Sequence, residues 1–168
     1  MSFLDTLWKR DAFHRQLLQI ADKHPTAEMQ GKSECCRSGV CCWRRPGCLE
    51  PADVPKIAAH LGLTENELFR QRLVVDEIGG VTCLVPARQH QVGEFTGRML
   101  PNDETFSIKS PCTFLGPDNS CTIHEVKPHD CREFKCWTGQ YPEPCQFPED
   151  QLKQLGWDGF DSDAYYDD

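Results

Sequence analysis

The chain has 168 residues, a net charge of −8 at pH 7 and 11 cysteines. This length is typical of one domain, and the acidic charge argues against a surface that binds nucleic acid. The uncharged stretches are too short for a transmembrane helix and the charged N-terminus is unlike a secretory signal peptide, so we expect a cytoplasmic protein that does not bind membranes.

The first part of the chain predicts three helices. Residues 4–22 have apolar residues at helical spacing, and a loop rich in Gly, Ser and Arg follows over residues 26–50. A second helix is expected to begin near Pro51, which suits a first-turn position, and to end at Gly62. Residues 64–67 have the Thr-x-x-Glu spacing of a capping box, which predicts a third, short helix.

The pattern then changes from helical spacing to alternation. Residues 74–85 predict a β-hairpin whose two strands are joined by a turn at Gly79-Gly80. Cys83 shares a strand face with Val81 and Val85, which predicts a buried thiol rather than a ligand.

The rest of the chain predicts fewer regular elements. We expect a loop over residues 86–104, a short strand over 105–108 and a turn over 116–120. A short helix is expected from Pro128, and several prolines predict an extended segment over residues 142–148.

Residues 149–168 are strongly acidic, with seven acidic residues against Lys153. We expect a solvated, partly disordered tail, although its aromatic residues could dock onto a basic partner protein. The expected fold class is therefore α+β. We expect one small domain over residues 1–148, in which short helices and a β-hairpin surround a cysteine-ligated metal centre, followed by this acidic C-terminal tail.

Cysteine is the most informative residue type in the chain. Hydrophobic residues make up 39% of the sequence, but without cysteine the share falls to about a third, which is little for a core of this size. A bound metal commonly supplies the missing stability. Because a reducing compartment disfavours disulfides, the thiols are expected to be metal ligands, catalytic groups or buried apolar filler.

Ten of the cysteines form two groups. The first group comprises Cys35, Cys36, Cys41, Cys42 and Cys48, and the second comprises Cys112, Cys121, Cys131, Cys136 and Cys145. Cys83 is the only cysteine in the long segment between them. This arrangement suggests two halves of one site that folding brings together.

The spacing within the groups favours a polynuclear centre over a single ion. No two cysteines have the Cys-x-x-Cys spacing of a zinc knuckle. Neighbouring side chains such as those of Cys41 and Cys42 generally point in different directions, so they suit a cluster or two metals better than one tetrahedral ion. Arg37, Arg44 and Arg45 could offset the negative charge of the ligands, or contact a phosphate or an acidic partner.

Two motifs in the chain resemble those of a known family. Residues 34–44, Glu-Cys-Cys-Arg-Ser-Gly-Val-Cys-Cys-Trp-Arg, are similar to the first motif of the CxxCxxCC family of small cysteine-cluster proteins. Residues 111–134, which run from Pro-Cys-Thr-Phe-Leu to Cys-Arg-Glu-Phe, resemble that family's second half, so that the resemblance spans roughly residues 34–136. The family is described as zinc- or iron-chelating, its members are often labelled iron–sulfur proteins, and a related domain occurs in flagellin lysine N-methylases.

The resemblance implies a set of metal ligands. These are Cys35, Cys41 and Cys42 in the first motif and Cys112, Cys121 and Cys131 in the second. Ser38 stands where the family has a further cysteine, so Cys36 or Cys48 is expected to replace that ligand. Cys136 and Cys145 lie at or beyond the edge of the match and are weaker ligand candidates.

The resemblance and side-chain chemistry also suggest roles for other polar residues near the second motif. Arg132 fits the family's Cys-Arg step and is expected to bind the cofactor through a cluster sulfur, or else to bind a local carboxylate. His124 is expected to be structural, because the family often has tyrosine there, and the remaining histidines have no motif support. Glu125, Asp130 and Glu133 could act in acid–base chemistry, but on a short helix they are expected to be solvated.

Three functions remain open at this point. The first is an iron–sulfur protein with an electron-transfer or accessory role to a modifying enzyme. The second is a structural zinc module that binds a protein partner, and the third is a thiol redox or metal-buffering protein. No enzymatic chemistry can be assigned, since the chain has neither a Gly-rich nucleotide loop nor a Gly-x-Ser-x-Gly elbow.

Overall fold

The computed structural model describes residues 42–43, 46–105, 107–117, 120–133 and 143–159. The helix expected over residues 4–22 lies outside the described residues, and so do Cys35, Cys36, Cys41 and Cys136.

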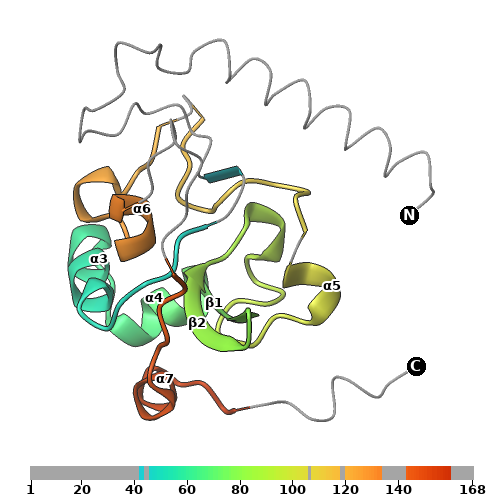
Figure 1. Ribbon diagram of the computed structural model, residues 1–168. Helices are drawn as coiled ribbons and strands as arrows, with labels where there is room; N and C mark the ends of the chain where they lie inside the picture. The colour runs from blue at the N-terminus through green and yellow to red at the C-terminus, as the bar shows by residue number, and fades with distance from the viewer. Residues whose placement is uncertain (1–41, 44–45, 106, 118–119, 134–142, 160–168) are drawn as a thin grey trace, which may run out of the picture.

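Helices α3 and α4 follow each other closely along the chain (Figure 1). α3 spans Asp53–Leu61 and ends at Gly62, whose φ of 69° is left-handed and favours glycine. α4 spans Glu65–Arg72 and begins at a capping box. There the backbone N–H of Glu67 donates to the Thr64 hydroxyl, and the backbone N–H of Thr64 donates to the Glu67 carboxylate at 2.8 Å. Both helices, the glycine stop and the capping box are confirmed.

The predicted β-hairpin is also confirmed. β1 spans Leu73–Ile78 and pairs antiparallel with β2, which spans Val81–Pro86. Gly79 and Gly80 form the turn, and their φ values of 59° and 81° are in the left-handed region that two-residue hairpin turns require. Cys83 is fully buried in a small core cluster on the hairpin, as predicted.

The segment after the hairpin is more regular than predicted. A 3-10 helix, η2, spans Gln89–Gln91 within the expected loop, and a short helix, α5, spans Asn102–Thr105. The strand expected over residues 105–108 is wrong, because Thr105 is the last residue of α5. Its backbone N–H donates to the carbonyl of Pro101 at 3.2 Å, which is a helical hydrogen bond.

The second cysteine group lies on short elements. η3 spans His124–Val126, and α6 spans His129–Glu133 in the place where a short helix was expected. Residues 143–148 have no regular secondary structure. The backbone N–H of Phe147 donates to the carbonyl of Thr82 at 2.9 Å, which attaches this segment to β2.

The expectation of a solvated tail is wrong for the first residues after position 148. α7 spans Glu149–Leu155, and its Leu152 is fully buried in the main core together with Trp157. The side chain of Asn66, on α4, donates to the carbonyl of Leu155 at 3.2 Å. The acidic residues of α7 therefore surround an apolar face that packs against the domain. Residues 160–168 lie outside the described part of the chain.

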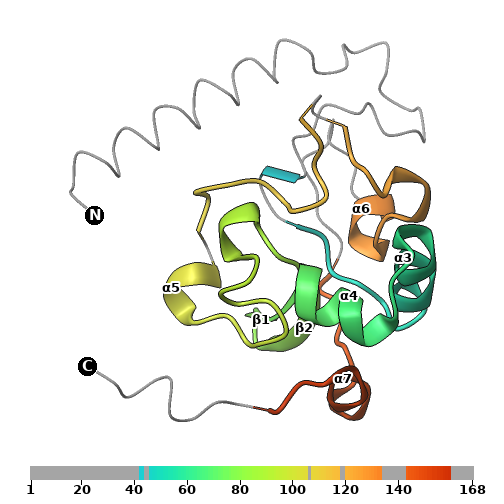
Figure 2. The same ribbon diagram turned by 180° about the vertical axis from the view of Figure 1, so that it is seen from behind.

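The helices surround the hairpin. α3 and α6 lie side by side at one side of it and α5 lies at the other, as the two opposite views agree (Figure 1, Figure 2). A large core cluster joins residues of α3, α4, β1 and α7 to the second cysteine group, and a smaller cluster lies on the hairpin. The expected α+β class is confirmed. Within the described residues, no helix is both long enough and apolar enough to cross a membrane.

Candidate metal centre

Cys42, from the first cysteine group, lies beside two cysteines of the second group. The backbone N–H of Cys112 donates to the carbonyl of Cys42 at 2.7 Å, and the side chain of Cys121 is hydrogen-bonded to that of Cys42. Cys42 and Cys112 are buried in the main core cluster, and Cys121 packs against it. Folding therefore brings members of the two cysteine groups together.

A tight loop carries Cys121 back toward this place. The backbone N–H of Gly116 donates to the carbonyl of Ser120 at 2.8 Å, which closes the turn expected over residues 116–120. Leu115 and Cys121 form an isolated antiparallel bridge across this loop. His124, which was expected to be structural, is half-buried at the start of η3.

The surroundings of Cys121 favour its thiolate form. A hydrogen bond with the Cys42 side chain lowers the pKa of the Cys121 thiol, while burial opposes this effect. A hydrogen bond with the backbone of Ile123 and the positive charge of Lys127 lower it further, so that the pKa of Cys121 is about 7. Because the thiolate is the form that binds metals, this thiol is prepared for coordination at neutral pH.

A second set of cysteines lies where the loop before α3 meets α6. Cys48 is fully buried, and its backbone N–H donates to Asp130 Oδ2 at 3.1 Å. Cys131 lies against Gly47, where a Cβ atom would be only 2.5 Å from the Cys131 Sγ. Gly47 is therefore required for the close approach of the loop to α6.

Cys145 lies beside this second set, in acidic surroundings. Burial raises the pKa of the Cys145 thiol, and the charges of Asp130, Cys48, Glu50 and Asp53 raise it further, to about 11.

Asp130 is only 1% exposed, so the expectation that it is solvated is wrong. Its carboxylate faces the loop before α3 because it accepts the backbone hydrogen bond from Cys48. By contrast, Glu125 and Glu133 are exposed, as expected.

Asp53 holds the same region together. Its Oδ2 atom accepts the backbone N–H groups of Glu50, at 2.8 Å, and of His129, at 3.0 Å. Its Oδ1 atom accepts a hydrogen bond from Arg132 Nη1 at 2.7 Å, and Arg132 also donates to the carbonyl of Lys127. Of the two roles expected for Arg132, the structure therefore shows the one with a local carboxylate.

Glu50, His129 and Cys145 form a compact group of possible metal ligands. One ligand atom of each residue lies within 4.8 Å of the others, and all three side chains are half-buried. His129 Nδ1 and Glu50 Oε1 are 3.1 Å apart. His129 had no motif support in the sequence, and Glu50 and Asp53 were not singled out as functional residues. The sequence feature that could have indicated a role for them is their position around Pro51, at the start of a helix close to the first cysteine group.

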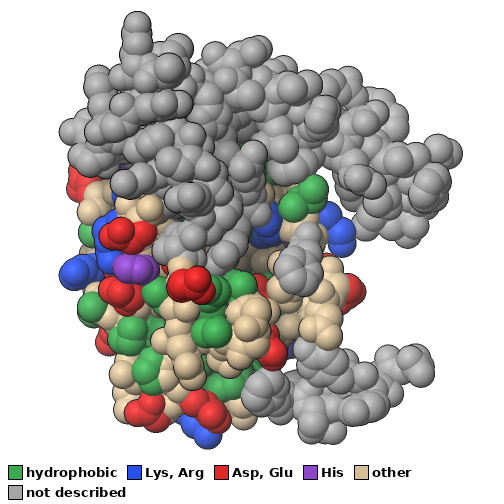
Figure 3. Space-filling view, in the orientation of Figure 1, with side chains coloured by type: hydrophobic (Ala, Val, Ile, Leu, Met, Phe, Trp, Pro, Cys, Tyr) green, Lys and Arg blue, Asp and Glu red, His purple; other side chains and the backbone are tan. Residues whose placement is uncertain are grey.

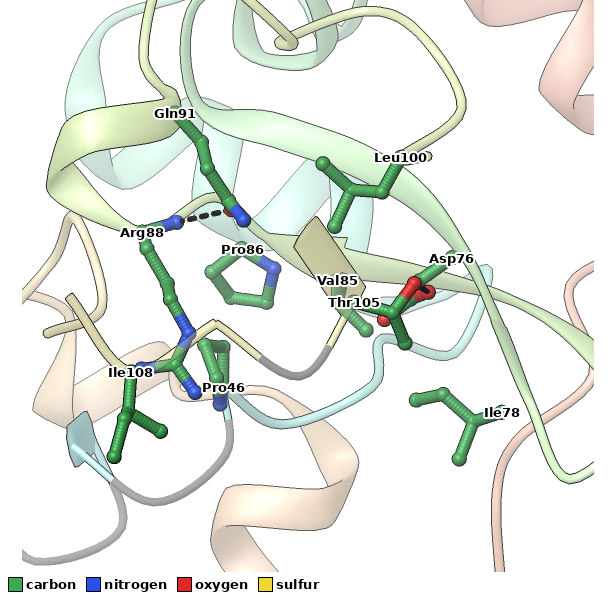
Figure 4. Close-up of a pocket in the computed structure, with 10 residues that line it drawn as sticks. All are labelled: Pro46, Asp76, Ile78, Val85, Pro86, Arg88, Gln91, Leu100, Thr105 and Ile108. Carbon is green, nitrogen blue, oxygen red and sulfur yellow. Dashed lines mark hydrogen bonds between the residues drawn. The ribbon is translucent and has the colours of Figure 1, made fainter. Parts of the chain in front are cut away.

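Arg88 connects the cysteines to a cavity beside the hairpin. Its Nη1 atom donates to the carbonyls of Trp43 and Ser110, each at 2.9 Å, and its backbone forms an isolated bridge with Cys112. The cavity has a volume of about 260 Å³, and Figure 4 shows Arg88 along one side of it and Asp76 toward the other. Arg88 therefore positions the backbone next to Cys42 and next to Cys112.

The ligands expected from the sequence thus fall into three classes. Cys42, Cys112 and Cys121 lie together, whereas Cys48 and Cys131 belong to the second set around Asp130. Cys48 was one of two candidates, with Cys36, to replace the ligand missing at Ser38, and it packs in the small core cluster of the hairpin rather than in the cluster that holds Cys42. The other expected ligands, Cys35, Cys36, Cys41 and Cys136, lie outside the described residues.

A small α+β domain in which cysteines from distant segments lie side by side is typical of the class of cysteine-rich metal-binding proteins. More particularly, the chain belongs to the CxxCxxCC family, because that family's model, described as "Putative zinc- or iron-chelating domain", matches residues 33–156. The match confirms the resemblance and extends it to include α7. Searches of curated proteins and of solved structures found no significant match.

Proposed function

We propose that this protein binds an iron–sulfur cluster through Cys42, Cys112 and Cys121, with a further ligand from the first cysteine group. The observation that carries the proposal is that Cys42 lies next to both Cys112 and Cys121, although these cysteines are 70 and 79 positions further along the chain. Four cysteine thiolates are the usual ligand set of such clusters. Cys35, Cys36 and Cys41 are the candidates for the remaining position.

Two features support a cluster rather than a single zinc ion. Cys41 directly precedes Cys42, and two neighbouring thiols suit a polynuclear centre better than one tetrahedral ion. Cys42 and Cys112 are also buried in a core cluster of apolar side chains that includes Phe114 and Ile123, and Cys121 packs against it. Such packing limits the access of water, which is one of the factors that set the reduction potential of a cluster.

When bound, an iron–sulfur cluster supplies electron transfer. We therefore propose an electron-transfer or accessory role to a modifying enzyme, with that enzyme as the protein partner and the reducing cytoplasm as the location. The protein's own residues would hold the cluster and limit its contact with water. The net charge of −8 supports a protein partner rather than nucleic acid.

Structural zinc is the alternative. The family description names both metals, and four thiolates also suit zinc. In that case the function would lie in a partner-binding surface supported by the metal. Thiol redox chemistry or metal buffering becomes the better explanation if neither metal co-purifies with the protein.

Anaerobic purification followed by analysis of iron, zinc and acid-labile sulfide tests the proposal. We expect a brown protein with visible absorption and with iron and sulfide in similar amounts. Cys42→Ser, Cys112→Ser and Cys121→Ser should each lose most of the iron and sulfide. Cys83→Ala is the matched control, because Cys83 is a buried cysteine on the hairpin that lies outside this group.

The metal content separates the alternatives. A colourless protein that contains zinc and no sulfide would support the structural zinc site. Full iron and sulfide in all three serine variants would show that the cluster is held elsewhere in the chain.

A further inference from the structure

We propose that Glu50, His129 and Cys145 form a second metal site, which takes a single divalent cation of the zinc class. The proposal goes beyond the cysteine cluster, because Glu50 and His129 are not among the ligands that the CxxCxxCC motifs imply, and Cys145 was expected only as a weaker ligand candidate for the cluster. Each residue comes from a different segment. Glu50 precedes α3, His129 begins α6, and Cys145 lies in the extended segment before α7.

The donor set and its dimensions suit zinc. Sulfur, imidazole nitrogen and carboxylate oxygen are the three kinds of protein ligand that zinc binds. With metal–ligand bonds of about 2.0–2.3 Å, tetrahedral ligands lie roughly 3.3–3.8 Å apart. The three ligand atoms lie within 4.8 Å of one another, so small side-chain rotations would bring them into position. His129 and Glu50 keep 27% and 42% of their side chains exposed, which leaves access for the ion and for a water molecule as fourth ligand.

Asp53 fixes two of the three ligands relative to each other. The same oxygen of its carboxylate accepts the backbone N–H groups of Glu50 and His129. Asp53 is itself only 1% exposed and is held by Arg132. A buried carboxylate that is held in this way orients the residues around a metal and supports them from outside the coordination shell.

The charge around Cys145 also favours a cation. The carboxylates of Glu50, Asp53 and Asp130 all act on this thiol, and Arg132, which pairs with Asp53 and lies 3.7 Å from Glu50, offsets only part of their charge. Figure 3 shows acidic side chains beside a histidine on the side of the molecule that carries α3 and α6. An ion pair between Glu50 and His129 would explain their contact, but it gives no reason for a thiol to lie among carboxylates. A divalent cation does, because it attracts all of these groups.

Metal analysis of the full-length protein tests the site. Wild type, Cys145→Ser, His129→Ala and Glu50→Gln are stripped of loosely bound metal, incubated with zinc alone and desalted, and their zinc, iron and sulfide are measured. We expect the serine and alanine variants to lose about one zinc equivalent per chain and to keep their iron and sulfide. Glu50→Gln should bind zinc more weakly. His60→Ala and Cys83→Ala are the controls, since His60 is an exposed histidine of α3 and Cys83 a buried thiol.

X-ray absorption at the zinc edge is measured on the zinc-loaded wild type. Its result therefore does not depend on how well the variants fold. We expect a zinc shell with one sulfur and with nitrogen and oxygen ligands. A shell of sulfur alone, or equal zinc content in wild type, Cys145→Ser and His129→Ala, would overturn the proposal. Failure of the iron–sulfur proposal is recognised separately, by the absence of iron and sulfide from the wild type.

Discussion

At the scale of single residues, Asp53 has the most consequences for the structure. Its carboxylate joins the loop before α3 to the start of α6 through the backbone of Glu50 and His129, and it pairs with Arg132. A carboxylate that is 1% exposed is stable only when its oxygens are paired and hydrogen-bonded, and here both oxygens are. Its loss would leave the backbone N–H groups of Glu50 and His129 without this acceptor and would remove the ion pair with Arg132.

Asp53→Ala should therefore lower the free energy of unfolding by about 3 kcal/mol. Urea unfolding followed by circular dichroism measures the change. Asp103→Ala is the control, because Asp103 is an exposed acidic residue in the first turn of α5 and should cost less than about 0.5 kcal/mol. Equal unfolding midpoints for the two variants would contradict this role of Asp53.

Glu104 predicts how stability depends on pH. Burial raises the pKa of the Glu104 carboxyl, but hydrogen bonds from His90 and Gln91 and the charge of Lys109 outweigh burial, so the pKa is below its ordinary value of 4.5. The folded state thus binds this proton less tightly than the unfolded state does. The stabilisation is complete above pH 4.5 and is lost as the pH falls through the lower, folded-state pKa.

Glu104→Gln should accordingly be less stable than wild type near neutral pH, and the difference should shrink as the pH falls from about 6 to about 3. Urea titrations at several pH values measure it. An exposed control, Glu125→Gln, should show no such convergence. A difference for Glu104→Gln that grows toward low pH would be the wrong sign and would refute the assignment.

The sequence predicted residues whose environment is set locally, and missed those whose environment is set by distant segments. The thiol of Cys83 was correctly expected to be buried, because strand alternation places it with two valines. Asp130 was expected to be solvated, because a five-residue helix gives no sign of what lies against it. Only the fold reveals that the loop at Gly47 and Cys48 covers this carboxylate.

At the scale of elements, the same distinction holds. Three local signals predicted element boundaries that the structure contains. They are Gly62 at the end of α3, the capping box at residues 64–67 at the start of α4, and the Gly79-Gly80 turn between β1 and β2. The strand expected over residues 105–108 depended on four alternating residues. Directly before it stands a helix-start signal, Pro101 followed by polar and acidic residues, and the structure follows that signal.

α7 is a helix that the acidic composition of its segment did not predict. The acidic residues of its segment predicted a solvated tail, yet Leu152 and Leu155 face the main core, and Gly156 ends the helix with a φ of 109°. Leu152→Ala should lower the free energy of unfolding by about 2–5 kcal/mol, because it leaves a cavity in the main core. Lys153→Ala, on the exposed face, is the matched control for urea unfolding. Similar stabilities of the two variants would mean that α7 does not contribute to the core.

At the scale of the whole molecule, six of the seven described cysteines, all but Cys83, occupy the places where segments distant in sequence meet. Cys42, Cys112 and Cys121 join the start of the described chain to the second motif within the main core. Cys48, Cys131 and Cys145 join the same loop to α6 and to the segment before α7. The spacing of the cysteines predicted that two groups would meet. It did not predict two sets of contacts, because spacing carries no information about which side of the loop each thiol faces.

Metal binding should therefore contribute to the stability of the whole domain. A ligand that binds only the folded state stabilises it by about 4 kcal/mol when its free concentration is roughly a thousand times its dissociation constant. Removal of metal with an anaerobic chelator should lower the urea midpoint of the wild type. Cys112→Ser should begin with a lower midpoint and respond less to the chelator, because a ligand of the proposed cluster is already missing. Identical midpoints for wild type with and without chelator, after the removal of metal has been verified by elemental analysis, would show that the apolar core is stable without a metal.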